Sequence, residues 1–508
     1  MKKNKIYLGL TILSLTFGSC QKLLMIDPES SLTQDDIQEI VKKNPDKILE
    51  PLVANLVASI NSYSNINSVD TKNYSVNNLL LSLKGNDMVL ANSPSWLKGD
   101  YEMRSYREES TGRVQVYWGT FYRYIFLANQ ILTVIPEVNE SELTAANKSI
   151  LRYKATALAI RSFAYTNLMW LYQNDYMNGG KDKLGVPITD ATGDPKPRAT
   201  SAEVWNLIMS DAETAVSLFK KIDGYYTTSR TDVDGSVASS FLVRAALTTG
   251  NWDKTVAAAN DILTYYPELF NENEYTTSGM SLLSKETIFG YEYSSTSGKG
   301  TSSFHGWMNP KSEGGYGGSQ GHWMAIDQRL FDKISATDYR KKNFVQDESI
   351  DFTYPTSGAK VKFLKYYSLK FAAPKISAAI PEYNQNEIYI RSSEIILAKA
   401  EALVRANKDA EAQTALFQLV SKRDPNYVKS TKTGTALFDE IKLQRRIELW
   451  GEGGHEFFDN KRWNIAVDRT SSINHSEKKV VPAGKDFTLQ IPLNTELSYN
   501  DLIQEQNP

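Results

Sequence analysis

The chain has 508 residues, and 57 Lys and Arg stand against 59 Asp and Glu, so the formal net charge is −2 at pH 7. This balance lacks the basic footprint of a nucleic-acid-binding protein. One cysteine excludes an internal disulfide, and with four histidines we expect no metal or other cofactor. Aromatic residues make up 11 % of the chain, enough for a core with rings left for a binding surface.

The N-terminus predicts export. Lysines at positions 2, 3 and 5 precede an apolar run at residues 6–17. This run fits a secretory signal peptide and is too short to span a bilayer. Small residues at 18 and 19 then precede Cys20, which resembles the lipobox of a bacterial lipoprotein. We therefore expect residues 1–19 to be a leader and Cys20 to be lipidated. The alternative is an ordinary signal peptide with Cys20 a free thiol.

Residues 20–34 are polar, contain one proline and predict an extended tether. A helical period dominates after it. Apolar residues recur at helical spacing over 117–135, where Pro136 stops the pattern, and again over 150–171. Thr200 and Glu203 have the spacing of a capping box, so a third helix is predicted to begin there and to continue through Val216.

Two later helices, 237–247 and 252–265, are predicted to form a closely packed pair. Alanines line both, and the junction contains Gly250, which suits the left-handed residue that ends a helix. The pair is similar to a tetratricopeptide repeat. Residues 388–405 and 409–420 predict another such pair, and we expect about four pairs in a mostly α-helical fold.

Between these pairs lies a glycine-rich stretch, residues 271–325, with a short strand-like run at 287–293. Residues 350–385 and 424–436 are predicted to be irregular as well. Long loops inside a globular chain are usually functional or disordered. We therefore expect a loop-rich, ligand-binding insertion over 271–385.

Several motifs, in this order, resemble those of one family. They lie at 118–129, at 161–165 with 185–187, at 390–402, at 445–463 and at the C-terminal end, 491–508. The chain is identified from them as similar to the SusD/RagB family, although His455 stands where that family has arginine. The resemblance implies a SusD-like fold with tetratricopeptide-like helix pairs and long ligand-binding loops. Its parts would be a leader (1–19), a lipid-anchored tether (20–34) and one domain (35–508), divided into 35–270, 271–385 and 386–508.

The same resemblance implies a function. Family members are cell-surface lipoproteins of the outer membrane that bind nutrient over a TonB-dependent transporter of the SusC/RagA type. The expected ligand is an oligosaccharide, and an oligopeptide, as in RagB, stays open. The slightly acidic chain favours a neutral sugar over an acidic one. A surface glycan-cleaving enzyme is the less favoured alternative, because the aromatic loops show no pair of carboxylates.

Charged residues of the motifs are expected to be structural. Arg391 and Glu394 lie three residues apart, as do Arg445 and Glu448, so each pair is predicted to meet on one helix face. Buried charges must be paired, which favours a structural network over ligand contact. The set expected to form this structural signature is Arg391, Glu394, Arg445, Glu448, Asp459, Arg462 and Trp463.

Enzyme motifs are incomplete. Residues 317–321 match the letters of a nucleophile elbow, but no strand is predicted before them. Residues 455–459 lack the second histidine of a zinc-protease helix. Residues 232–235 lack the acids that would complete a calcium loop, so a turn is expected there. We expect no enzyme activity and no catalytic residue.

Aromatic residues in the irregular stretches are the candidate ligand contacts. Rings on loops have no helix face to bury them, and a sugar can stack on such rings while its hydroxyls meet polar groups. We expect the 92–106 and 300–323 stretches to converge, with the three tryptophans as the main stacking rings; ordinary packing under the loops is the alternative. The candidate ligand-binding residues are Trp96, Tyr101, His305, Trp307, Tyr316 and Trp323.

Overall fold

Helices dominate the computed structural model of the chain, as the sequence predicts. It describes residues 33–66, 68–91, 95–104, 106–294, 300–375, 381–503 and 505–507. The leader, Cys20 and the tether up to residue 32 lie outside these described residues. Within the described ranges, no helix is both long enough and apolar enough to cross a membrane.

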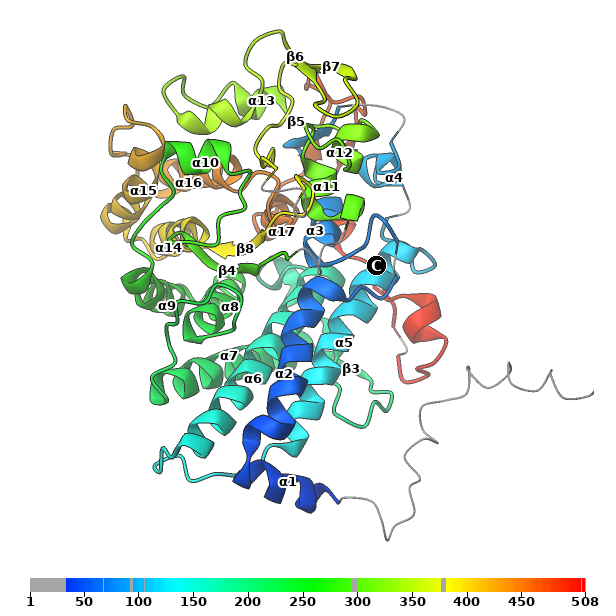
Figure 1. Cartoon of the computed structure of the whole chain (residues 1–508), viewed down its shortest axis with the longest axis vertical. Coiled ribbons are helices and arrows are strands. Elements are labelled where there is room, and N and C mark those ends of the chain that lie inside the picture. Colours follow the sequence, from blue (N-terminus) through cyan, green and yellow to red (C-terminus); the bar gives the residue numbers. More distant parts are fainter. Residues whose placement is uncertain are drawn as a thin grey trace, which may run out of the picture.

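Figure 1 labels the helices and most of the strands. The helices are α1 (Gln34–Lys43), α2 (Pro45–Ser62), α3 (Tyr74–Ser82), α4 (Lys98–Tyr101), α5 (Gly112–Val134), α6 (Ala145–Tyr172), α7 (Ser201–Lys221), α8 (Gly235–Thr248), α9 (Trp252–Tyr265), α10 (Glu272–Thr277), α11 (Phe304–Met308), α12 (Tyr316–Ser319), α13 (Gln328–Phe331), α14 (Ser392–Arg405), α15 (Asp409–Arg423), α16 (Gly434–Glu448) and α17 (His455–Arg462). The strands are β1 (Met88–Leu90), β2 (Leu184–Pro187), β3 (Arg198–Thr200), β4 (Thr287–Tyr291), β5 (Met324–Ile326), β6 (Ser349–Thr353), β7 (Lys360–Leu364), β8 (Glu387–Arg391), β9 (Val467–Asp468) and β10 (Val480–Val481).

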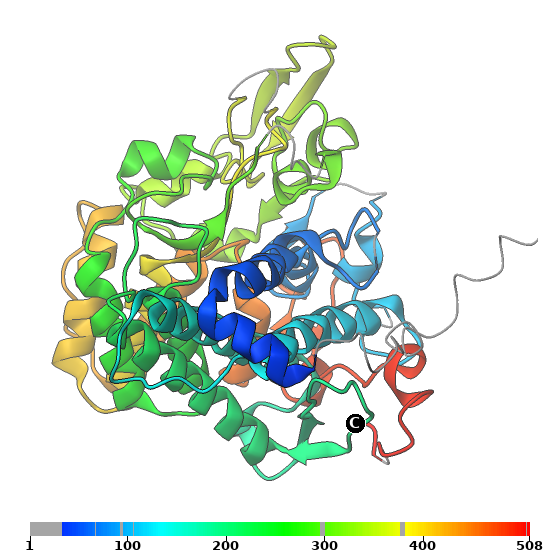
Figure 2. The same ribbon diagram turned by 60° about the horizontal axis from the view of Figure 1, so that its bottom comes forward.

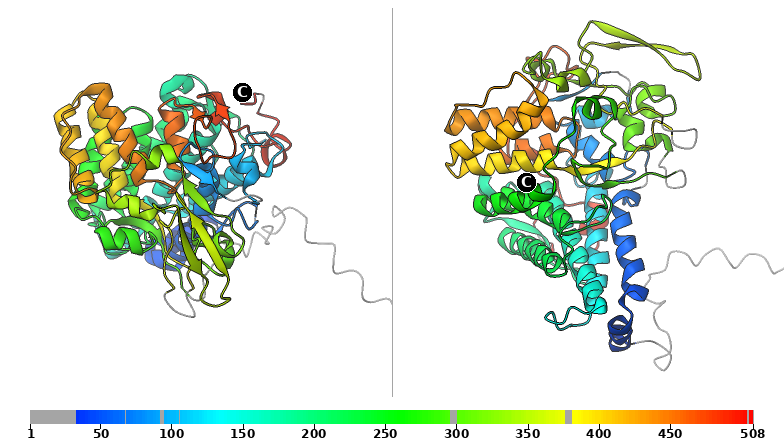
Figure 3. Two further views of the ribbon diagram at one scale, coloured as in Figure 1. Left: turned by 90° about the horizontal axis from the view of Figure 1, so that it is seen from above. Right: turned by 60° about the vertical axis from the view of Figure 1, so that its left-hand side comes forward.

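The long helices form a continuous array. Helices α5 to α9 pack successively against one another, α14 packs on α9, and α15 and α16 pack on α14. The array places the C-terminal helices beside the α8–α9 pair, far from them in sequence (Figures 2 and 3). Gly250 between α8 and α9 has φ +74°, the left-handed conformation expected of it. The tetratricopeptide-like arrangement of this pair is therefore confirmed.

Local signals also placed several helix ends. Thr200 is the N-cap of α7, its hydroxyl accepts from the backbone N–H of Glu203 at 3.2 Å, and the Glu203 carboxylate accepts from the Thr200 N–H at 2.8 Å. The predicted capping box is confirmed, although α7 runs past Val216 to Lys221. The prediction of helix from residue 388 is wrong, because residues 387–391 form β8 and pair with β4 before α14 begins.

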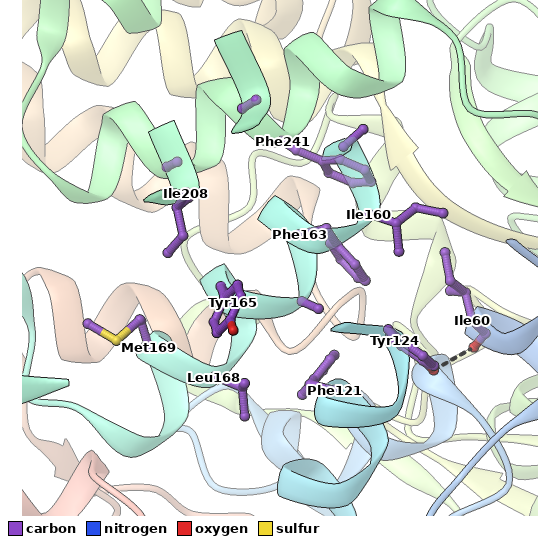
Figure 4. Packing of buried hydrophobic residues seen from close by; sticks show 14 of the residues in the cluster. Ile60, Phe121, Tyr124, Ile160, Phe163, Tyr165, Leu168, Met169, Ile208 and Phe241 are labelled. Atoms are coloured by element: carbon purple, nitrogen blue, oxygen red, sulfur yellow. Dashed lines mark hydrogen bonds between the residues drawn. The ribbon is translucent and has the colours of Figure 1, made fainter. Parts of the chain in front are cut away.

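Aromatic side chains lock the helical array together. Phe163 of α6 lies 6.2 Å from Phe121 of α5 and 4.8 Å from Phe241 of α8, measured between ring centroids. Tyr124 of α5 donates its hydroxyl to backbone carbonyls of α2 (Figure 4). The core thus joins the N-terminal helices to the middle of the array, and each ring buries a large apolar area.

The loop-rich part, 271–385, has more regular structure than its composition predicts. Strand β4 pairs with β8, and β5 pairs with β1. Strands β6 and β7 form a hairpin that projects from the body of the protein (Figure 3). The expectation that 350–385 is wholly irregular is therefore wrong. A separate cluster of buried apolar residues from α3, α4, α11 and β5 underlies this part, so these loops have a core of their own.

Candidate functional site

A short strand pair brings the two aromatic loop stretches together. Strand β1 pairs antiparallel with β5, with Met88 opposite Ile326 and Leu90 opposite Met324. The N–H of Ala91 then donates to the carbonyl of Trp323 at 2.8 Å, which extends the ladder toward the loops. The predicted convergence of the 92–106 and 300–323 stretches is confirmed for their described residues.

Trp96 lies on the outside of this junction. Its neighbour Leu97 is 1 % exposed and anchors the segment in the loop core, whereas Trp96 is 58 % exposed. The Trp96 ring contacts two rings from the other stretch, Tyr316 at 5.1 Å and His322 at 5.7 Å between centroids. An exposed indole held in place by neighbouring rings is a surface on which a flat ligand can stack.

Trp307 supports these rings from below. It stacks on Tyr316 with centroids 4.6 Å apart and an interplanar angle of 21°, and it lies 5.2 Å from His322. Its own side chain is 1 % exposed, and its indole N–H donates to the carbonyl of Val69 at 3.0 Å. We call Trp96, Tyr316, His322 and Trp307 the aromatic cluster, with Trp96 outermost and Trp307 buried.

His322 adds a polar atom to the cluster. Its backbone N–H donates to the carbonyl of Tyr316 at 3.3 Å, which fixes the two residues side by side. Burial lowers the pKa of His322, so the imidazole is neutral at neutral pH. Its Nδ1 atom has no hydrogen-bond partner within the described part of the chain. The sequence placed His322 among the loop aromatics, but nothing local distinguished it as a site residue.

Two of the candidate ligand contacts face the interior instead. Tyr101 is 1 % exposed, and its hydroxyl lies 2.7 Å from Nδ1 of His475. His305 is equally buried, with Nε2 3.0 Å from the carbonyl of Asn386, and burial lowers the pKa of His305 to about 4. The premise that loop rings have no helix to bury them is wrong here, because α4 and α11 are helical turns with inward faces.

Trp323 points away from the cluster. Its ring packs against Phe363 of β7 at 5.8 Å and against Tyr367 at 5.6 Å. Neighbouring residues of an extended segment project to opposite sides, so His322 and Trp323 cannot both join the cluster. The structure thus brings together Trp96, Trp307 and Tyr316, and it separates Tyr101, His305 and Trp323 from them.

The glycines of this part serve internal packing. A side chain on Gly317 would lie 2.5 Å from the Trp307 carbonyl oxygen, and one on Gly318 would lie 1.9 Å from that of Ser312. No larger residue fits at such distances, so these glycines let α12 pack directly on the α11 segment. They hold Tyr316 over Trp307, and the close approach they permit is to the protein's own backbone.

The motif arginines and glutamates form a buried network around Glu448. Its carboxylate pairs with Arg423 at 2.9 Å, with Arg340 at 3.0 Å and with Arg391. Arg391 also pairs with Glu286 and Glu452, both at 2.7 Å. Burial by itself would raise the pKa of Glu448, yet the three guanidinium groups outweigh it and hold that pKa well below its usual range.

A second group of the signature residues pairs across α14, α16 and α17. Arg445 pairs with Asp459 at 2.6 Å, and Asp459 pairs with Arg462 at 2.9 Å. Arg462 and the Trp463 indole both contact Glu401. Glu394 pairs with Arg244 of α8 at 2.7 Å.

The predicted pairs Arg391–Glu394 and Arg445–Glu448 are therefore wrong, although the charges are buried as expected. Arg391 is the last residue of β8 and Glu394 lies in α14, so the two do not share a helix. Arg445 and Glu448 do share α16, but each reaches a charge from a distant segment instead. The burial of both networks shows that they hold the fold together rather than face solvent.

Motifs considered for enzyme or metal chemistry have ordinary structural roles. The Ser319 hydroxyl donates to the Gly315 carbonyl at 2.8 Å inside α12, and α12 does not follow a strand. Asp234 is the N-cap of α8 and accepts from the N–H groups of Ser236 and Val237, both at 3.0 Å. Among the described residues, no group of three His, Cys, Asp or Glu could hold a metal ion.

Comparison with known proteins agrees with this architecture. The sequence model of the SusD family matches residues 332–496, and a related model, described as starch-binding associating with outer membrane, matches residues 38–247. Together these matches cover most of the chain. The chain belongs to the SusD family. The SusD family models thus span both the helical array and the charged signature.

Relatives of known name are distant but extend over the whole fold. A SusD-like protein P38 from Formosa agariphila is 23 % identical, over 92 % of each chain. A SusD-like carbohydrate binding protein from Bacteroides vulgatus is 21 % identical, with a TM-score of 0.74 over 90 % of this chain and 96 % of that one. A laminarin binding SusD-like protein has 20 % identity and a TM-score of 0.67, over 91 % and 99 %. These structural likenesses establish the SusD-like fold.

Proposed function

We propose that this SusD-family chain is a cell-surface glycan-binding lipoprotein that captures an oligosaccharide and delivers it to a TonB-dependent transporter of the SusC/RagA type. The exposed indole of Trp96, held on Tyr316 and His322, carries the proposal. A sugar ring offers C–H groups to such a ring and hydroxyls to the polar groups beside it. The starch-binding description of one matching family model and the laminarin-binding relative support a glycan ligand.

The role we propose is binding without catalysis. Glycoside cleavage needs two carboxylic groups across a bound sugar. The described contacts of the aromatic cluster are with other rings and with backbone carbonyls, and the serine of the candidate nucleophile motif is held inside α12. Incubation with the bound oligosaccharide should leave its length unchanged in chromatography, and shorter products would contradict a pure binding role.

Binding can be tested with one variant and one control. Trp96→Ala should weaken binding of the cognate oligosaccharide roughly tenfold or more, because a stacked aromatic at an interface contributes about 2 kcal/mol. Tyr499 is 75 % exposed and does not belong to the cluster, so Tyr499→Ala is the matched control. Equal affinities of both variants in calorimetry would place the site elsewhere. Binding of an oligopeptide instead of any sugar would favour the RagB-type function.

Anchoring is part of the same proposal. Residues 1–19 would be the leader, residues 20–34 the tether that follows lipidated Cys20, and residues 35–508 one domain with its binding loops at 271–385. Cys20→Ser should shift the protein from the detergent phase to the aqueous phase in phase partitioning. A wild-type protein that already partitions into the aqueous phase would rule out the lipid anchor.

Partnership with a transporter has its own test. Purification of the protein from native outer membranes in mild detergent should recover a large β-barrel protein with it. Recovery of the lipoprotein alone, across several detergents and growth substrates, would argue against delivery to a transporter and leave glycan capture as the role.

A further inference from the structure

A second concave surface lies apart from the aromatic cluster. It is a groove of about 630 Å³ between α2, α6, the segment that joins α7 to α8, and β4. This volume falls within the range of small-ligand sites. None of the cluster residues lines it. We call it the α2–β4 groove.

A buried amide faces this groove without a partner. Asn61 at the end of α2 is 1 % exposed and lines the groove. Its Oδ1 accepts from Nδ2 of Asn73 at 2.8 Å and from the hydroxyl of Tyr389 at 3.2 Å. Its Nδ2 has no hydrogen-bond partner among the described residues. A buried N–H group without an acceptor costs free energy, so a ligand that supplies a hydrogen-bond acceptor to this donor would be favoured.

The orientation of this amide is fixed by the residues behind it. Asn73 is the N-cap of α3, and its Oδ1 accepts from the backbone N–H of Val76 at 3.0 Å. The Nδ2 of Asn73 must therefore be the atom that points at Asn61, and the oxygen of Asn61 must point back at it. Rotation of the Asn61 amide would set two donors against each other. The N–H groups of Asn61 are thus held in place as donors just beneath the surface of the groove.

The remaining lining selects the chemistry of a ligand. Apolar side chains that share the floor and walls come from α2, β4 and β8; they include Val53, Val57, Phe289 and Tyr389. Among the described residues that line the groove, the exposed carboxylates are Glu50, Asp232 and Glu292, and the cation is Arg152. This excess of carboxylates disfavours an anionic oligomer. Apolar walls, carboxylate acceptors and a fixed amide donor together suit a ring with C–H faces and hydroxyl groups.

We propose that the α2–β4 groove is a second binding site for a neutral oligosaccharide, separate from the aromatic cluster. The inference rests on the proposed glycan-binding function for its ligand class and on the groove's own geometry for its place. Two sites on one chain would let the protein hold a long glycan at two points, or two short ones.

Two small residues allow the groove to be filled without touching the core. Ala54 and Ala58 lie one turn apart on α2, are exposed, and line the groove. Leucine is a good helix former, so the double variant Ala54→Leu/Ala58→Leu should fold as the wild type does. Asn55 is exposed on the same helix outside the lining, so Asn55→Leu is the matched control.

The experiment is titration calorimetry of the wild type, the filled-groove variant, Asn55→Leu and Trp96→Ala. The probes are laminarihexaose, maltohexaose and cellohexaose. For at least one sugar the wild type should bind two equivalents. The filled-groove variant should lose binding at the groove, and Trp96→Ala should lose binding at the aromatic cluster. In each variant the affinity of the affected site should fall roughly tenfold or more. Asn55→Leu should bind as the wild type does.

The outcomes separate the two proposals. If Trp96→Ala loses binding of every sugar that the wild type binds, while the filled-groove variant binds them unchanged, the second site is overturned and the proposed function stands. If binding is lost only in the filled groove, the second site stands and the aromatic cluster is not the site. Absence of binding for all three sugars would overturn both. Binding of mixed tryptic casein peptides that the filled groove abolishes would reassign the groove to peptides and overturn the carbohydrate site.

Discussion

The charge network around Glu448 and the aromatic cluster around Trp96 both contain residues that the sequence singles out, Arg391 and Glu448 in the network and Trp96 and Trp307 in the cluster. In the network every charged group meets an opposite charge inside the protein, and Glu448 is 0 % exposed. In the cluster the outermost ring, that of Trp96, is 58 % exposed. Groups that satisfy one another hold a fold, whereas groups with an open face are available to a ligand.

The largest effect we expect comes from breaking the network. Glu448→Ala would leave Arg340, Arg391 and Arg423 without a shared carboxylate in the interior. Loss of one partner from a buried ionic group costs about 3–5 kcal/mol of unfolding free energy. Denaturant titration measures this loss. Glu272→Ala breaks an exposed pair with Lys342, so it is the control and should cost below about 1 kcal/mol. Equal stability of both variants would contradict the view that the charge network holds the fold together.

Trp307→Ala should lower both the stability of the fold and the affinity for sugar. It removes a buried indole, at a cost of about 3–5 kcal/mol of unfolding free energy, and it takes away the ring on which Tyr316 stacks. Sugar affinity should therefore fall together with stability. Trp307→Phe keeps a ring and should be milder in both measurements. Normal stability with lost affinity would mean that Trp307 touches the ligand directly.

The pH dependence of stability should reveal Lys461, a buried cation of α17 next to the signature residue Arg462. Its ammonium donates to the carbonyl of Trp170 at 2.6 Å, and burial lowers the pKa of Lys461 to about 7 from its usual value near 10.5. Between these pH values the unfolded chain binds more protons at this position, so the contribution of Lys461 to stability rises with pH. Below pH 7 both states are protonated and the contribution is constant.

The variant Lys461→Met removes the pH-dependent contribution of Lys461 to stability. The difference in unfolding free energy between variant and wild type should change by a few kcal/mol between pH 7 and pH 10, in favour of the wild type at high pH. Lys220 is half exposed, so Lys220→Met is the control and should follow the wild-type curve. A constant difference for Lys461→Met across this window would show that its pKa is not lowered.

The smallest effect should come from Trp323, which the structure separates from the cluster. Trp323→Ala removes packing against Phe363 and Tyr367, at a cost of about 1–2 kcal/mol of unfolding free energy. Its sugar affinity should equal that of the wild type. Trp96→Ala should show the reverse, with unchanged melting and weakened binding. Weak binding by Trp323→Ala would extend the site toward the β6–β7 hairpin.

Much of the helical scaffold was predictable because its signals are local. The Thr200–Glu203 capping box and the left-handed Gly250 each depend on residues a few positions away. The start of β8 was predicted wrongly, because the apolar residues 388–390 run directly into the apolar pattern of α14 and only the pairing with β4 separates them from that helix. Ile and Tyr favour strands, but this preference depends on context, so pairing with a distant segment decides the outcome.

The sequence by itself determined the family, the helical class and the gathering of aromatic residues on two loop stretches. Tertiary structure alone decided which ring is exposed and which charges meet. Glu448 lies three residues from Arg445 but bonds Arg391, 57 positions away, and Arg340, 108 positions away. The physical reason is that burial and ion pairing depend on contacts between segments distant in the chain, whereas helix caps and turns depend on a few neighbouring residues.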